Sequence, residues 1–431
     1  MSSSRASVPV LDRLLDAVTL LAGRDGYGQL TVEKVLVCAG VSRASFYQYF
    51  SDLDDCFVSA YRRHAEQLAL DVEEAVSRSG QRELAMLEAL VDAAIGRPWA
   101  SQLLMIEGHA SGSAGRSERA ALVSRIVAVT GPARAGYAMD FPTTILVGAV
   151  FRFLSVRLSE TGVTAEQREE VLEWAGAFKR HTSQQFWSAA FAPTMPAPAS
   201  CPLPALGRAR TGSPRERILL ATRETVSERG YRAVAVADIV TAAGVSRRRF
   251  YNEFSSKAAA SVAAYEQGFQ RALAECAPAF FSSPDWPERI WQSSLAFAKF
   301  LVREPSFASF GFVECYTIGR GFASRMHDTQ LAFTLFLEEG YRQGPQAKPV
   351  SRASSALIAA TAAEIGYQIS HSATTSYIRR MQPLMVYLAL VPFLGPDTAG
   401  PFVADKLGVS GAAARQPKHR NVCGSMHTSS A

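Results

Sequence analysis

Ala39-Gly40-Val41-Ser42-Arg43 occurs a second time, residue for residue, as Ala243-Gly244-Val245-Ser246-Arg247. When the sequence is laid on itself at this offset of 204 residues, residues 11–57 align without a gap onto residues 215–261. A period of this length indicates a duplicated domain, because solenoids are built from much shorter repeats.

Each copy of this block has the pattern of two short helices joined by a tight turn. In the first copy Thr31 can cap the first helix and Ser42 the second, while Gly40 allows the turn between them. Phe46 and Phe50 are four residues apart in the second helix and therefore face inward. Its other surfaces carry Arg43, Ala44, Ser45, Tyr47 and Gln48. Such a pair of helices forms a helix-turn-helix, whose second helix fits the major groove of DNA.

The rest of the sequence predicts helices, so we expect an all-α fold. Apolar residues recur at spacings of three and four, as in Leu84, Leu87 and Val91, and no alternation of period two is sustained. Residues 193–214 contain six prolines and predict a linker. Residues 396–431 are rich in Gly, Pro and Ser and predict a disordered tail.

The composition argues against several classes of protein. Apolar residues make up 48% of the 431 residues, yet no apolar run reaches the ~20 residues of a membrane helix, so we expect no membrane segment. Residues 1–10 lack a basic segment followed by an apolar run, which favours a cytoplasmic protein. The six cysteines are scattered and form no C-x-x-C pair, which argues against disulfides and a zinc site.

No sequence pattern typical of an enzyme is present. G-x-S-x-G, H-E-x-x-H and Walker-type loops are absent, and the glycines between Gly23 and Gly28 follow a helix rather than a strand, which excludes a dinucleotide fingerprint. We expect no enzymatic activity, no cofactor and no metal. The net charge of +6 permits a nucleic-acid partner without requiring one.

The order of these features resembles a known DNA-binding domain. A long helix, Gly-Tyr, a short helix beginning Thr-Val, Ala-Gly-Val-Ser, an aromatic pair and Phe-Ser resemble the DNA-binding domain of the TetR family of bacterial one-component repressors. In the second copy Phe254-Ser255-Ser256-Lys257 resembles the family's usual start of the fourth helix. The resemblance implies two tandem TetR-like units, each an N-terminal helix-turn-helix DNA-binding domain followed by a helical ligand-binding and dimerisation bundle. The boundaries that we expect are 1–57 and 58–192 for the first domain and bundle, 193–214 for the linker, 215–261 and 262–395 for the second domain and bundle, and 396–431 for the tail.

The resemblance also implies which residues contact a double-stranded DNA operator. In the first copy these are Arg43, Ala44, Ser45 and Tyr47 at base edges, Gln48 and Tyr49 near phosphates, and Thr31 and Ser42 at the helix starts. In the second copy they are Ser246, Arg247, Arg248, Arg249, Tyr251 and Asn252, with Lys257 on a phosphate. Arginine can bind guanine bidentately, and Ser, Tyr and Asn supply hydrogen bonds. Each copy departs from the family at one position, since Leu53 stands where the second copy has Lys257 and Ala235 where the first has Thr31.

The regions behind the two helix-turn-helices correspond to the family's ligand-binding bundles. The second of them is rich in aromatic residues, which favours a pocket for a small hydrophobic or aromatic effector there, although core packing is the alternative for any single Phe. The candidate ligand-binding residues are Glu107, His109, Phe310, Glu314, Tyr316, His327, Phe333 and His371. Two apolar stripes are candidates for a pairing seam, with internal core as the alternative: Val171, Trp174 and Phe178, and Ile378, Met381, Met385 and Leu388.

These features together predict a sequence-specific transcriptional repressor that a small effector releases. A proline-rich linker of 22 residues spans about 70 Å, more than the ~34–36 Å between half-sites, so we expect the two halves to pair within one chain as a pseudo-dimer. The alternative is a helical protein-interaction module in which one or both helix-turn-helices no longer bind DNA.

The two copies differ in charge. Residues 1–60 carry five basic and seven acidic side chains, whereas residues 208–262 carry eleven basic and five acidic ones. Because phosphate neutralisation supplies much of the affinity for DNA, we expect the second copy to dominate binding.

Overall fold

The computed structural model describes residues 9–130, 141–160, 164–169, 171–172 and 212–342, together with 359–361, 363–364, 367, 382–383, 385–387, 389–390 and 393–407. Helices and turns make up this part of the chain, and no strand occurs in it. The predicted all-α fold is therefore confirmed.

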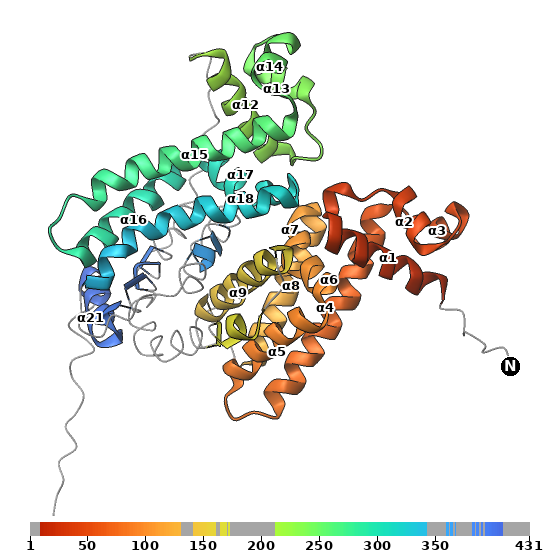
Figure 1. The fold of residues 1–431 in the computed structure, drawn as a ribbon, viewed down its shortest axis with the longest axis horizontal. Helices are drawn as coiled ribbons and strands as arrows, with labels where there is room; N and C mark the ends of the chain where they lie inside the picture. The colour runs from red at the N-terminus through yellow and green to blue at the C-terminus, as the bar shows by residue number, and fades with distance from the viewer. Residues whose placement is uncertain are drawn as a thin grey trace, which may run out of the picture.

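Each copy begins with a small helical lobe, which we call a head. The first head comprises α1 (Val10–Asp25), η1 (Tyr27–Gln29), α2 (Val32–Ala39), α3 (Arg43–Tyr49) and the start of the long helix α4 (Leu53–Ser77). The second head comprises α12 (Pro214–Arg229), α13 (Val236–Ala243), α14 (Arg247–Glu253) and the start of α15 (Lys257–Phe280). In Figure 1 the heads are two separate lobes, and α3 and α14 lie toward their outer ends.

Apolar residues at helical spacing hold each head together. Leu14 and Val18 of α1 and Phe46 of α3 are fully buried, as are Ile218 of α12 and Phe250 of α14. Full burial of a side chain of this size contributes roughly 1.5–3 kcal/mol. The same inward positions are therefore filled in both copies.

The other helices form one bundle behind each head. The first bundle contains α5 (Arg82–Gly96), α6 (Pro98–Gln102), η2 (Leu103–Glu107), α7 (Gly108–Ala110), α8 (Gly112–Val129) and α9 (Phe141–Glu160). The second contains α16 (Trp286–Arg303), α17 (Pro305–Phe312), η3 (Glu314–Thr317), α18 (Arg320–Leu331), η4 (Ala332–Arg342) and α21 (Pro396–Lys406). Because α4 and α15 each run from a head into its bundle, they connect the two parts directly (Figure 1).

The prediction that a disordered tail begins at residue 396 is wrong, because residues 396–406 form helix α21. Ala399 and Val403 of this helix are fully buried, and Phe402 lies edge-on to Trp291 of α16 with ring centroids 6.4 Å apart. An apolar face at four-residue spacing thus orders a segment whose Gly and Pro content suggested disorder. Residues 408–431, and residues 193–211 of the predicted linker, lie outside the described residues.

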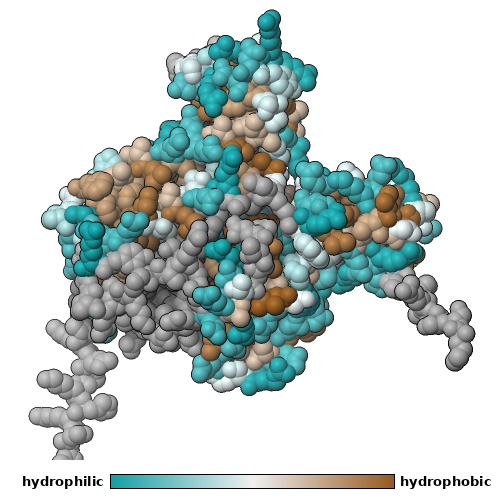
Figure 2. All heavy atoms as spheres, in the orientation of Figure 1, coloured by the Kyte–Doolittle hydropathy of each residue, from teal (hydrophilic) through white to brown (hydrophobic). Residues whose placement is uncertain are grey.

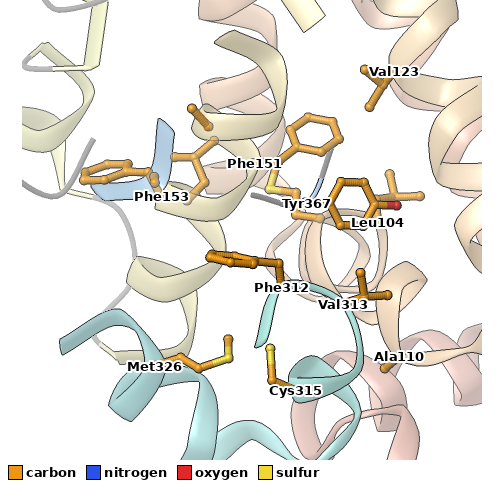
Figure 3. Close-up of a cluster of buried hydrophobic side chains, with 14 of the residues drawn as sticks. Leu104, Ala110, Val123, Phe151, Phe153, Phe312, Val313, Cys315, Met326 and Tyr367 are labelled. Atoms are coloured by element: carbon orange, nitrogen blue, oxygen red, sulfur yellow. The ribbon is translucent and has the colours of Figure 1, made fainter. Parts of the chain in front are cut away.

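The two copies pack against each other behind the heads. Helix α7 lies against η3, and α9 lies against α18. Figure 3 shows a buried hydrophobic cluster at this junction, where Leu104 and Phe151 of the first copy lie near Phe312, Cys315 and Tyr367 of the second.

The predicted pairing seam is only partly within the described residues. There, Val171 is buried and Met385 is half-buried. Outside them lie Trp174, Phe178, Ile378, Met381 and Leu388. None of the described helices is long and apolar enough to cross a membrane.

Candidate nucleic-acid interface

The helix-turn-helix of the first head has the predicted caps and turn. The Thr31 hydroxyl accepts a hydrogen bond from the backbone N–H of Lys34 at 3.2 Å, and the Ser42 hydroxyl accepts one from Ser45 at 3.0 Å. Gly40 has a φ of 63°, in the left-handed region that favours glycine. Arg13 donates to the Gly40 carbonyl at 3.2 Å, so a side chain of α1 holds the turn in place.

The second head repeats this turn with one change. Gly244 has a φ of 60°, and Arg217 of α12 donates to its carbonyl at 3.2 Å. The Ser246 hydroxyl accepts from the N–H of Arg249 at 3.1 Å. Ala235 has no side-chain oxygen to cap α13, but the Asp238 carboxylate accepts from the Ala235 N–H at 2.7 Å and fixes the start of this helix.

The outer faces of α3 and α14 present the residues that the sequence singled out. Tyr47 is 51% exposed and Tyr251 is 46% exposed, while Phe46 and Phe250 beside them are fully buried. Ser45 is half-buried. The exposed candidates are Thr31, Ser42, Arg43, Ala44, Gln48, Tyr49, Ser246, Arg247, Arg248, Arg249 and Asn252. Each head therefore offers one exposed helix with polar, aromatic and basic side chains to a groove.

The two exposed helices differ in charge. Three consecutive arginines begin α14, and one of them, Arg249, pairs with Glu253 at 3.1 Å. The guanidinium of Arg247 lies 5.9 Å from the centre of the Tyr251 ring. In Figure 2 the outer end of the second head is mainly hydrophilic, whereas the first head combines hydrophilic and hydrophobic areas.

Lys257 occupies a structural position at the base of the second head. Its ammonium donates to the carbonyls of Tyr231 and Val234 at 2.6 and 2.7 Å and lies 4.0 Å from the centre of the Tyr231 ring. Two of its three N–H groups are thus used to hold the turn before α13. Its predicted phosphate contact stays a prediction that depends on the remaining N–H.

A buried glutamate connects each bundle to its head. Glu107 in η2 accepts a hydrogen bond from the backbone N–H of Tyr27 at 2.7 Å, and Glu314 in η3 accepts one from Tyr231 at 3.2 Å. Tyr27 and Tyr231 are equivalent in the repeat, so the contact occurs in both copies. Burial raises the pKa of the Glu314 carboxyl, against the opposing effect of Arg116. Each glutamate therefore links its bundle to the turn that follows the first helix of the head.

Charged and aromatic side chains cross the boundary between the copies. Arg116 of the first copy lies 3.4 Å from Glu314 of the second, and the ring of His109 is stacked on Tyr316 with centroids 5.0 Å apart. Arg232 of the second head lies 3.8 Å from Asp54 and 4.5 Å from the Tyr27 ring centre of the first copy. The bases of the heads therefore touch.

A small cavity lies at this boundary. Its wall includes Gly26 and Gln29 of the first head, Glu107 of η2, Ser155 of α9 and Tyr316 of η3. Its volume of about 20 Å³ is room for one or two water molecules. The cavity therefore touches a head, a bundle and the opposite copy at once.

The structure brings together only part of the predicted ligand-binding set. Glu107 and Tyr316 line the cavity, His109 and Glu314 lie next to it through the contacts above, and Phe310 is buried in α17 without lining it. The side chains of His327 and Phe333, and all of His371, lie outside the described part of the structure. In that part, no group of three His, Cys, Asp or Glu side chains is arranged to hold a metal ion.

Sequence reasoning missed the charged residues at the centre of the boundary. Arg119 and Arg152 of the first copy both bind the carboxylate of Glu364 in the second, at 3.4 and 2.9 Å. The available signal was that Arg152 and Glu364 each interrupt an apolar helical run. Taken alone, such an interruption does not identify its partner.

Comparison with known proteins supports the assignment of the two heads. Residues 14–60 and 218–260 each match the family model described as bacterial regulatory proteins, tetR family. The matched segments run from α1 into α4 and from α12 into α15. A search of curated proteins found no match to the chain.

Proposed function

Since two segments of the chain match the model of the tetR family of bacterial regulatory proteins, we propose that it is a sequence-specific transcriptional repressor with two tandem units, which a small effector releases from its operator. The observation that carries this proposal is the duplicated, capped turn that leaves α3 and α14 exposed at the outer ends of two heads. Helices of this kind dock in the major groove and contact base edges. Two such helices in one chain can occupy two half-sites.

The proposed contacts divide into base readout and phosphate binding. Arg43, Tyr47, Arg247 and Arg248 are exposed on α3 and α14, where arginine can bind guanine bidentately. Thr31 and Ser42 in the first copy and Ser246 in the second lie at helix starts, where hydroxyl groups reach phosphates. In the repeat, Ala44 and Ser45 align with Arg248 and Arg249, so the two exposed helices carry different side chains. We therefore expect the operator to be an imperfect palindrome with unlike half-sites.

We propose that the two halves act as a pseudo-dimer within one chain, in the cytoplasm and without enzymatic activity. The contacts of Arg116, Arg119 and Arg152 with glutamates of the second copy support pairing within the chain. Light scattering is expected to give the mass of one chain. A species containing only two chains, with the halves of each chain apart, would contradict this arrangement.

Selection of genomic fragments with the purified full-length protein, followed by footprinting, tests the function. We expect a protected site with two unlike halves and binding that weakens steeply with salt. Tyr47→Ala together with Tyr251→Ala is expected to abolish selective binding, while Phe281→Ser, at an exposed site on the bundle, should leave it unchanged. Salt-insensitive binding or no selected site would favour the protein-interaction module instead.

Effector release is proposed to act through the cavity between the copies. A small hydrophobic or aromatic molecule that enlarges this cavity would displace Glu107 or Tyr316, and Glu107 holds the first head. By linkage, such an effector and the operator weaken each other's binding by the same factor. Titration of DNA in the presence and absence of a candidate effector measures that factor in both directions.

A further inference from the structure

Two arginines and one glutamate are buried where the copies meet. Arg119 is 2% exposed, Arg152 is 4% exposed and Glu364 is completely buried. Both guanidiniums lie against the same carboxylate oxygen, Oε2 of Glu364. Gly148 leaves room for this carboxylate, since a Cβ at position 148 would lie 2.3 Å from Cδ of Glu364. One carboxylate therefore lies against two guanidinium groups.

The guanidiniums retain hydrogen-bond donors that no described residue accepts. Nη1 and Nη2 of Arg152 and Nε of Arg119 are buried and have no hydrogen-bond partner among the described residues. Residues 343–358 and 365–381, which precede and follow the Glu364 segment, contain no Asp or Glu. Burial lowers the pKa of the Arg152 guanidinium despite the opposing effect of Glu364. Leaving a buried charge without a counter-charge costs several kcal/mol, so this cluster favours an anion.

Aromatic rings border the same guanidiniums, and one of these rings also lines the cavity. Arg152 lies 4.8 Å from the ring centre of Tyr316 and 5.4 Å from that of Tyr367, and Arg119 lies 5.1 Å from Tyr367. Tyr316 also lines the cavity. So does Ser155, whose hydroxyl donates to the Arg152 carbonyl at 2.8 Å. The cavity and the arginine cluster therefore share the Tyr316 ring as a common wall.

We infer that Arg152 and Arg119 form a binding site for a carboxylate at the junction of the two copies, reached through the cavity that Tyr316 and Ser155 line. The inference rests on the proposed function, since it makes the effector a small organic acid. A carboxylate has the planar, two-oxygen geometry that an arginine binds with two parallel hydrogen bonds. The Tyr316 and Tyr367 rings accommodate the apolar or aromatic part of such an acid. Because the cavity holds only one or two waters, a larger acid must separate the copies locally as it enters.

Thermal unfolding of the full-length protein without DNA tests the site. The probes are sodium acetate and sodium benzoate, compared with acetamide, benzamide and sodium chloride at matched ionic strength. We expect the carboxylates to raise the melting temperature in a saturable way by mass action, and the amides and chloride not to do so. Equal shifts with chloride or with the amides would overturn the proposal.

Variants with opposite expected signs separate binding from loss of stability. Arg152→Gln should weaken benzoate binding by about tenfold or more, because it removes a charge-assisted pair of hydrogen bonds. Glu364→Gln should strengthen benzoate binding, because it removes the competing carboxylate. Arg125→Gln, which loses a surface arginine paired with Glu66 and Glu73, is the matched control and should bind as the wild type does. If Arg152→Gln fails to fold, weaker or unchanged binding by Glu364→Gln still overturns the site.

A second measurement separates this site from the proposed function. Operator affinity is measured with and without benzoate in the wild type and in Arg152→Gln. Benzoate binding with no change in operator affinity would leave the site standing and remove its role in release. If benzoate does not bind and another ligand releases the protein from the operator, the carboxylate site is overturned and the proposed regulatory function stands.

Discussion

Arg248 stands at the middle of the three arginines of α14, and no ion-pair partner for it exists among the described residues. Its neighbour Arg249 is paired with Glu253. We expect Arg248→Ala to reduce the slope of log K against log salt by about one unit if the side chain neutralises one phosphate. Filter binding across a salt series measures this slope. Arg303→Ala, which removes a positive charge from the bundle, is the control and should leave the slope unchanged. An unaltered slope in Arg248→Ala would show that Arg248 does not contact a phosphate.

His64 makes the stability of the first head depend on pH. Its ring nitrogen lies 2.9 Å from the Thr19 hydroxyl, between α4 and α1, and burial lowers its pKa from 6.5 to about 4. The unfolded chain therefore binds a proton between pH 6.5 and 4 that the folded chain does not, and stability falls as the pH is lowered through this range. Thermal unfolding of the wild type and His64→Gln from pH 7 to pH 4 checks this. The variant should lose less stability over that range, and parallel curves would contradict the assignment.

At the scale of elements, the glutamates of η2 and η3 set how firmly each head is held. Glu314→Ala removes both the acceptor for the Tyr231 N–H and the partner of Arg116, while Glu314→Gln keeps an oxygen acceptor. Hydrogen bonds to charged groups are worth about 1.5–3 kcal/mol. We expect exchange of the Tyr231 amide hydrogen to speed up by about tenfold or more in Glu314→Ala and by less in Glu314→Gln.

Hydrogen exchange followed by mass spectrometry or NMR makes this measurement. Glu275→Ala, which breaks a surface pair with Arg303, is the control. Unchanged protection of Tyr231 in Glu314→Ala would show that the head is positioned by α15 alone.

The elements also show which structural features a sequence can predict. The caps at Thr31, Ser42 and Ser246 follow from local rules, because the hydroxyl satisfies an N–H three residues away. Helix α21 and the Glu364 cluster depend on partners far along the chain, Trp291 of α16 for the first and Arg119 and Arg152 for the second. No local pattern identifies those partners. The positions of His327, Phe333 and His371 in the effector site remain predictions.

At the scale of the whole molecule, the two copies pair through side chains of opposite charge. Arg152 of the first copy lies 2.9 Å from Glu364 of the second, and Arg119 of the first copy contacts the same carboxylate. The junction therefore joins two cationic side chains of the first copy to an anionic side chain of the second.

Reversing this pair tests its contribution. Arg152→Glu alone is expected to destabilise the protein by about 3–5 kcal/mol, because it leaves a buried charge without its counterpart. Combination with Glu364→Arg should recover a large part of that loss. Chemical denaturation of the wild type, both single variants and the double variant measures the coupling energy. A double variant whose loss equals the sum of the two single losses would show that the two side chains do not depend on each other.

Unlike halves give the molecule a polarity that a symmetric dimer lacks. A symmetric dimer on a palindrome looks the same from either end of the operator. In this chain the head rich in arginine and the head that is net acidic are held in one molecule by a junction at which Arg152 of the first copy contacts Glu364 of the second. A promoter on one side of such a protein therefore meets a different surface from a promoter on the other side, and inverting the operator exchanges the two.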